Sequence, residues 1–173
     1  MTYMGERIAA QPVHSARLEL EPLRPDHADE MAPLLDDAAL HEFIGGEPAT
    51  LAELRERYTR QAVGLSPDGS QRWLNWVARA RDGSAAVGTT QATVSATDGV
   101  ATAEVAWVVV RSQQGKGYAV ESARAMVQWL KEQGVEVVFA HVHPEHQASM
   151  AVARAIGLTP TDEVVDGEVR WWG

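Results

Sequence analysis

Cysteine is absent from this chain of 173 residues. The protein therefore has no disulfide bond, no thiolate metal ligand and no cysteine nucleophile. Long hydrophobic runs are also absent: no apolar stretch of the sequence approaches the ~20 residues that a helix needs to cross a bilayer. The first residues are polar and lack the pattern of a signal peptide. We therefore expect a cytoplasmic enzyme or binding domain that has no membrane partner.

Positive charge is scarce as well. The chain carries 15 Lys and Arg against 24 Asp and Glu, a net charge of -9. Nucleic-acid-binding domains normally present a basic surface, so this balance predicts that nucleic acid is not a partner. An acidic surface suits a cationic or amine-bearing partner instead. The six tryptophans lack the interspersed basic residues of a base-stacking platform, and we expect them in the core and in cleft walls.

The length predicts one domain, residues 1–173, with a loose lead-in over residues 1–15. Apolar periodicity and turn residues then predict strand, helix, helix, three strands, helix, strand, helix and a closing hairpin. The last three strands before the central helix include a long valine-rich one at 100–110. The nearly continuous apolar run at 135–143 is typical of a strand buried on both faces. This order predicts an α/β fold, a mixed sheet with helices on both sides.

The corner between the valine-rich strand and the next helix reads QQGKGYA, residues 113–119. A glycine-rich turn before a helix exposes backbone N–H groups and the positive helix end, which together can hold an anion. The Walker pattern fails because Val110 and Gly117 stand where it needs Gly and Ser or Thr. The dinucleotide pattern fails because Val120 replaces its third glycine. A third pattern, Gln/Arg-x-x-Gly-x-Gly/Ala, is satisfied by Gln114, Gly117 and Ala119.

This corner resembles motif A of the GNAT superfamily of acyl-CoA-dependent N-acetyltransferases. HPEHQASMAVARAIGLTP, residues 143–160, resembles the family's Pro-Glu-Asn-x-x-Ser…Gly-Phe segment, closest to the RimJ/RimL-like branch that acetylates ribosomal-protein N-termini. RLELEPLRPDHADEMAPLL, residues 17–35, resembles that branch's opening strand and first helix. The resemblance implies a GNAT-like mixed central sheet of about six to seven strands with helices on both faces. It also implies acetyl-CoA as cosubstrate, and it is compatible with a homodimer.

The resemblance assigns the pyrophosphate of CoA to the backbone of the glycine-rich corner: Gly115, Lys116, Gly117, Tyr118 and Ala119, with Gln114 in the motif. Gly117 and Ala119 let a bulky anion approach the main chain, and Lys116 adds charge at the rim. The preceding strand from Trp107 to Val110 is where relatives pair pantetheine with main-chain groups. A backbone N–H near Val108 would then stabilise the oxyanion, worth roughly 3 kcal/mol. The alternative is a glycine-rich corner that holds no ligand.

Glu104 is the candidate general base, since relatives carry a glutamate here. Strand alternation places it on one face with Thr102, Ala106 and Val108. Partial desolvation beside these small and apolar residues would raise the pKa of the carboxyl toward the range useful in a base. It would take the ammonium proton directly or through water. The alternative is an exposed glutamate on a solvated face.

Ser149 is the candidate for meeting the leaving thiolate, with Tyr118 as a second choice. The tyrosine that many relatives carry four residues before the motif-B glycine is Ala153 here. An early-helix serine can instead bond its own backbone. His146 replaces the family's usual asparagine beside the cofactor. His141 and His143 share a strand face, but without cysteine or a nearby third carboxylate we do not expect a metal site.

The sequence thus predicts direct transfer of an acetyl group from acetyl-CoA to a primary amine in a ternary complex. A protein or peptide N-terminus and a small-molecule amine both remain open as acceptors. Selection of the acceptor is expected from residues 42–60 and 162–170, which carry many carboxylates. The alternative function is a non-catalytic acyl-CoA-binding or sensing domain. The missing tyrosine and the substitution at His146 favour that alternative, and Glu104 opposes it.

Overall fold

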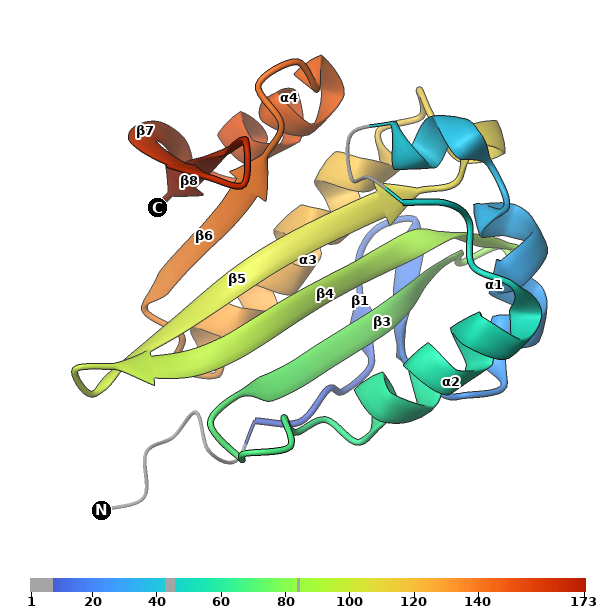
Figure 1. Ribbon diagram of the computed structural model, residues 1–173, viewed down its shortest axis with the longest axis horizontal. Coiled ribbons are helices and arrows are strands. Elements are labelled where there is room, and N and C mark those ends of the chain that lie inside the picture. Colours follow the sequence, from blue (N-terminus) through green and yellow to red (C-terminus); the bar gives the residue numbers. More distant parts are fainter. Residues whose placement is uncertain (1–7, 43–45, 84) are drawn as a thin grey trace.

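The structure is a computed structural model that describes residues 8–42, 46–83 and 85–173 (Figure 1). The first part of the expected lead-in, residues 1–7, lies outside the described residues, as do residues 43–45 within the expected acceptor segment. In the described part of the chain, eight strands form one mixed sheet in the order β1-β2-β3-β4-β5-β6-β8-β7. No helix in these ranges is long and apolar enough to span a membrane.

The helices and strands follow the predicted order. The strands are β1 Val13–His14, β2 Leu18–Pro22, β3 Arg72–Ala80, β4 Ala86–Thr97, β5 Val100–Val109, β6 Val137–Val142, β7 Thr159–Val165 and β8 Glu168–Trp172. The α-helices are α1 His27–Leu35, α2 Leu51–Ala62, α3 Tyr118–Glu132 and α4 Gln147–Ala155, and 3₁₀ turns lie at Ala38–His41 and Arg111–Gln113. The predicted number of six to seven strands is too low. The additional strand is β1, within the expected lead-in, where Val13 pairs with Leu20 of β2.

Helices cover both faces of the sheet, as predicted. α3 packs against one face through buried residues such as Met126 and Leu130, and it lies behind the sheet in Figure 1. α1 and α2 cover the other face near β3, where Met31 and Leu54 pack against Val77. Successive β3 side chains point to opposite faces, so one strand supplies both core layers. β3 is therefore packed by hydrophobic side chains on both of its faces.

β6 differs from the prediction of a strand buried on both faces. Val138, Ala140 and Val142 are buried, whereas Phe139 and His141 are only partly so. The reason is the position of the helices: α1 and α2 lie over β3 and leave this face of β6 less covered (Figure 1). Buried and partly exposed residues therefore alternate along this apolar run, and His141 lies on the more exposed face.

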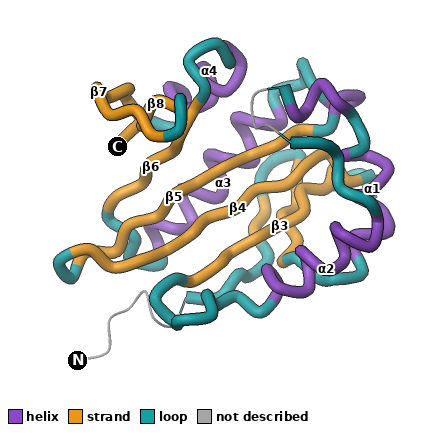
Figure 2. The backbone as a smooth tube through the Cα atoms, viewed as in Figure 1, coloured by secondary structure: helices purple, strands orange, loops and turns teal. Residues whose placement is uncertain are grey.

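β5 and β6 are parallel neighbours that separate along their length. Their paired residues run only from Thr102↔Val137 to Glu104↔Phe139, although β5 continues to Val109 and β6 to Val142. Figure 2 shows the two strands diverging toward their carboxyl ends. Main-chain groups of β5 beyond Glu104 consequently face an opening instead of a neighbouring strand. In open α/β sheets, ligands commonly bind beyond the carboxyl ends of parallel strands.

Candidate active site at the separation of two strands

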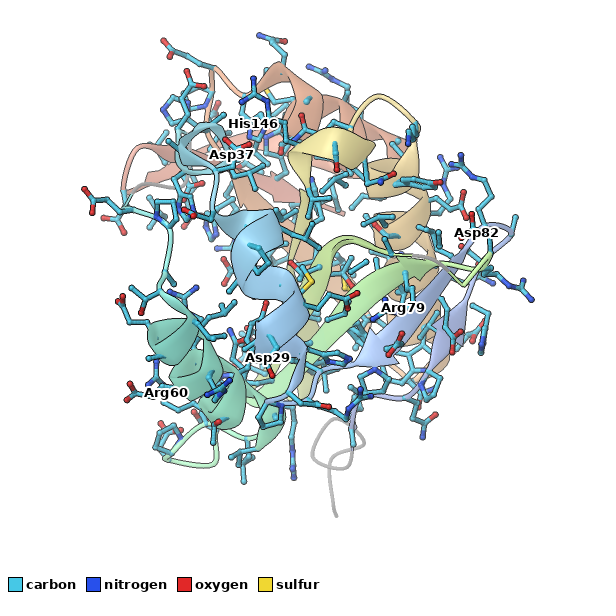
Figure 3. The ribbon with its side chains drawn as sticks, turned by 90° about the vertical axis from the view of Figure 1, so that its right-hand side faces the viewer. Asp29, Asp37, Arg60, Arg79, Asp82 and His146 are labelled. Carbon is cyan, nitrogen blue, oxygen red and sulfur yellow. The ribbon has the colours of Figure 1, made fainter. Side chains whose placement is uncertain are left out.

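A cavity of about 680 Å³ lies where β5 and β6 separate. Its walls are the end of β5, the glycine-rich corner, the end of β6 and the first turns of α3 and α4. Ala39, Leu40 and Glu42, from the segment between α1 and α2, form a further wall. In Figure 3, Asp37 of this segment and His146 of the α4 terminus lie at the same upper end of the molecule. The cavity thus gathers the segments that carry both sequence motifs.

The glycine-rich corner forms one wall of the cavity. Gln114, Gly115, Gly117, Tyr118 and Ala119 all line it. Gly115 and Gly117 have φ of 80° and 82°, a left-handed conformation that side chains other than glycine rarely adopt. Gly117 is the N-cap of α3 and provides no side-chain cap. The first N–H groups of this helix and its dipole are therefore directed at a site suited to an anion.

Lys116 does not line the cavity with the rest of the corner. Its ammonium donates to Oε1 of Gln113 at 2.9 Å, and its carbonyl accepts from Nη1 of Arg17 at 2.9 Å. The side chain thus belongs to the outer side of the loop. Any contribution to anion binding from Lys116 is the long-range one of a rim charge.

An ion pair that sequence reasoning missed supports this loop. Arg17 donates to the Glu121 carboxylate from its backbone N at 2.8 Å and from Nε at 2.7 Å, and Ser15 Oγ donates at 2.6 Å. Partial burial alone would raise the pKa of Glu121, but the hydrogen bonds from Ser15 and Arg17 lower it below its ordinary value. Because Arg17 and Glu121 are 104 positions apart, no local pattern signals the pair.

The structure corrects the part expected of Val108 and Val110. Val110 is buried in the core under α1 and α2, and its N–H donates to the Val87 carbonyl at 2.8 Å. Main-chain groups of alternate residues point to the same side of a strand, so the N–H of Val108 also faces β4. The N–H groups that face the cavity are those of Trp107 and Val109, one position along. The side chain of Val108 still lines the cavity.

Gln114 fixes the corner to β5. Its Nε2 donates to the Val109 carbonyl at 3.0 Å, a main-chain group on the cavity side of the strand. The first residue of the motif therefore has a structural role that its pattern alone does not reveal. It holds the glycine-rich loop at a fixed distance from the end of β5.

The first turn of α4 brings His146 and Ser149 together on the opposite wall. Both line the cavity, and Ser149 Oγ lies 3.4 Å from Nε2 of His146. Burial, and secondarily the neighbouring His143, lowers the pKa of His146, so the neutral imidazole is favoured. A neutral imidazole can donate to or accept from the serine hydroxyl. The contact recorded for Ser149 is thus to a side chain, whereas the alternative expectation was a bond to its own backbone.

Glu104 does not line the cavity but contacts a residue that does. Its side chain is 46% exposed, more than the expected desolvation beside small apolar neighbours implies. Oε1 of Glu104 lies 2.8 Å from Nδ1 of His141, whose side chain is 19% exposed and lines the cavity. Sequence reasoning considered His141 only as a metal ligand. Glu104 and His141 lie on the same face of the sheet, but this could be predicted only if the register between β5 and β6 were known.

Among the described residues, no group of three or more His, Asp or Glu side chains is placed to hold a metal ion. His141 of β6, His143 just after that strand and His146 at the N-cap of α4 instead line the cavity. His141 contacts a carboxylate and His146 contacts a hydroxyl. The site therefore offers proton-transfer and hydrogen-bonding groups.

Comparison with known proteins agrees with the resemblance that the two sequence motifs indicate. The family model described as the acetyltransferase (GNAT) domain matches residues 17–159. No curated protein matches the sequence.

Solved structures with the same fold include three acetyltransferases. One, from Salmonella typhimurium, is described as modifying the N-terminal serine of a 50S ribosomal subunit protein; it is 17% identical with a TM-score of 0.75, over 94% of this chain and 98% of that one. The aminoglycoside acetyltransferase AAC(6')-Ib, bound to coenzyme A, is 18% identical with a TM-score of 0.73, over 90% and 92%. A GNAT-family acetyltransferase from Bacillus anthracis is 18% identical with a TM-score of 0.73, over 94% and 96%. With the family match extending over most of its length, this chain belongs to the GNAT family of acetyltransferases.

Proposed function

We propose that this protein transfers an acetyl group from acetyl-CoA to a primary amine by direct attack within a ternary complex. The observation that carries the proposal is the cavity itself, which joins the glycine-rich corner, the unpaired end of β5 and the first turn of α4. The absence of cysteine from the chain removes the most common nucleophile for a covalent route. The amine nitrogen is then the nucleophile that attacks the thioester.

The residues present fit CoA. The first N–H groups of α3 and the corner from Gly115 to Ala119 would hold its pyrophosphate. Gly115 and Gly117 have positive φ and no side chain, so an anion can approach the backbone N–H groups there. The cavity-facing main-chain groups of Trp107 and the N–H of Val109 would pair with pantetheine as an added strand, while the Val109 carbonyl accepts from Gln114. When bound, acetyl-CoA supplies the thioester carbonyl that the amine attacks.

Three groups then serve the chemistry. A cavity-facing N–H at the end of β5 would stabilise the oxyanion. Ser149 would donate to the leaving thiolate while Nε2–H of the neutral His146 donates to its oxygen, since the two side chains already lie within 3.4 Å. Glu104 would serve in removing the ammonium proton, and its contact with His141 connects it to the cavity.

A cationic amine is the acceptor class that the charges favour. Glu42 and Glu168 line the cavity, one from each of the two segments, residues 42–60 and 162–170, that are expected to select the acceptor. Two carboxylates raise the local concentration of an amine in its ammonium form. Among solved structures with this fold, the named acceptors are a protein N-terminus in one and aminoglycosides in another, and both present cationic amines.

A second function, binding of acyl-CoA without catalysis, is favoured by one observation. Ala153, at the position of the usual tyrosine, is fully buried in the core and offers no acid to the thiolate. A binding domain would retain the corner and dispense with Glu104 and Ser149.

The test is release of free thiol from acetyl-CoA in the presence of amine panels: peptides with free N-termini, aminoglycosides and polyamines. We expect amine-dependent release with at least one cationic class, and acetylated product of the matching mass. CoA binding without turnover on any amine would favour the non-catalytic function.

A further inference from the structure

We infer that His141 is the group that takes the proton from the acceptor amine, and that Glu104 is a positioning residue that orients the imidazole and stabilises the charge that it gains. The inference rests on the proposed acetyl transfer and deepens it. It follows from a difference between the two side chains: His141 lines the cavity, whereas Glu104 does not. A base must reach the proton that it removes.

The position of the pair follows from the sheet. Glu104 and Phe139 are the last paired residues of β5 and β6, and His141 lies two positions further along β6 on the same face. At this point the strands separate, so His141 stands on the wall of the opening. Glu104 is its diagonal neighbour on the last paired stretch, within reach of a long side chain. The 2.8 Å contact between Oε1 and Nδ1 is the outcome.

The hydrogen bond fixes the tautomer of the neutral ring. A carboxylate can only accept, so Nδ1 of His141 must carry the proton and donate it to Glu104. Nε2 of the neutral ring then has a lone pair, as a general base requires. After proton transfer, the positive imidazolium lies beside the negative carboxylate, which stabilises it. Phe139 contacts the ring edge-on at 5.8 Å between centroids and limits its rotation.

Several neighbouring segments place charged side chains near the pair formed by His141 and Glu104. On β8, Arg170 is the register partner of His141, but its guanidinium lies over Phe139 at 4.2 Å and pairs with Glu163 at 3.1 Å. The remaining titratable side chains that line the cavity are Glu42, Arg111, Tyr118, His143, His146 and Glu168. Glu104 is the carboxylate in direct contact with the ring.

The proton balance of the step is complete. The ammonium transfers one proton to Nε2, and the freed lone pair forms the C–N bond to the thioester carbonyl. Collapse of the tetrahedral intermediate breaks the C–S bond, and the thiolate leaves with the electron pair. Of the two further ammonium protons, one stays on the amide and one ends on the thiol. The proton on His141 is released to solvent, which the exposed Glu104 side of the pair contacts.

The decisive variant is His141→Asn. An asparagine amide can keep the donor to Glu104 while removing the lone pair at Nε2. We expect kcat to fall by ~10²–10³-fold and the acidic limb of the kcat/KM–pH profile to disappear. The melting-temperature increase caused by CoA should be unchanged, which shows that the variant is folded. The matched control is His14→Gln, which removes the exposed pair of His14 with Glu19 on β1 and β2 and should leave kcat unchanged.

A second measurement needs no turnover. Long-range ¹H–¹⁵N spectra of histidine-labelled protein, assigned by the signals lost in His141→Asn, report which ring nitrogen carries the proton. We expect Nδ1–H in the wild type and a shift toward Nε2–H in Glu104→Gln. An Nε2–H tautomer in the wild type, or turnover of His141→Asn within about threefold of the wild type, would overturn the role of His141. A different result would contradict the proposed function itself: the wild-type protein would release no thiol from acetyl-CoA with any amine.

Discussion

The carboxylate of Glu104 does not line the cavity, so the role that we propose for it depends on a neighbouring side chain. Its only recorded side-chain partner among the described residues is Nδ1 of His141, at 2.8 Å. Sequence pattern and family resemblance singled out this residue of β5, but its 46% exposure is not the desolvation that was expected. The side chain reaches the cavity through an imidazole because β5 and β6 separate just beyond it.

Replacing Glu104 by Gln should lower kcat by ~10- to 10²-fold, less than the loss expected for His141→Asn. An amide lacks the negative charge that stabilises an imidazolium, and it no longer forces the proton onto Nδ1. Steady-state kinetics at saturating acetyl-CoA will measure the loss, and CoA affinity should stay within about twofold of wild type. Glu19→Gln, which alters the exposed pair with His14, is the matched control. Equal turnover in Glu104→Gln and wild type would assign Glu104 to the solvated face.

Ser149→Ala tests the thiolate donor. A serine hydroxyl is a poor acid that stabilises the thiolate more than it protonates it, so we expect a modest loss of ~10- to 100-fold in kcat, about 1–3 kcal/mol. A residue that only supports the start of α4 would lower stability by ~1 kcal/mol and leave turnover intact. Measuring the melting temperature and kcat on one preparation separates the two roles. Reduced stability with intact turnover would remove Ser149 from the site.

At the scale of elements, the close approach of β4 to β5 shapes the cavity. A Cβ at position 88 would collide with the Val108 carbonyl oxygen, so any side chain in place of Gly88 must push the strands apart. Gly88→Ala should therefore lower the free energy of unfolding by roughly 1–3 kcal/mol and weaken CoA binding severalfold. Denaturant unfolding and calorimetry will measure both, with the exposed Gln91→Ala on the same strand as control. Unchanged CoA affinity would show that this approach does not set the cavity wall.

The ion pair between Arg17 and Glu121 fastens β2 to the start of α3 beside the glycine-rich corner. Because hydrogen bonds hold the pKa of Glu121 below its ordinary value of 4.5, the carboxylate stabilises the fold above that pH. The contribution is lost as the pH falls through the lowered pKa. Glu121→Gln should thus cost about 1–2 kcal/mol at pH 7 and progressively less as the pH falls below 4.5. A difference that does not change with pH would contradict this ionic role, and Glu132→Gln is the control on the same helix.

Elements with strong local signals were predictable from the sequence. Thr50 is the N-cap of α2 and forms a capping box, in which its Oγ1 accepts from Glu53 N at 3.2 Å and its N donates to the Glu53 carboxylate at 3.2 Å. The hairpin turns at Asp166–Gly167 because both residues adopt positive φ. β1 escaped prediction because a two-residue strand has no periodicity of its own and depends on pairing with β2.

Across the whole molecule, the predicted order of elements and the helices on both faces of the sheet are confirmed. What local pattern could not supply is register. It decides that the N–H groups of Trp107 and Val109, and not that of Val108, face the cavity, and that His141 contacts Glu104. These pairings join positions far apart in the chain, so they follow from the assembled sheet alone. Contacts between residues far apart in the sequence therefore determine which chemical groups line the cavity.

Calorimetric titration with CoA tests the central claim most directly. The account predicts saturable binding to the wild-type protein and, through preferential binding to the folded state, a higher melting temperature. Ala119→Asp places a negative charge at the start of α3, where the helix dipole tolerates it but the CoA pyrophosphate is repelled, so binding should be lost while the fold is retained. Gln128→Glu adds the same charge on the exposed surface of α3 and should bind like wild type. No heat of binding in the wild type, or undiminished binding in Ala119→Asp, would contradict the account.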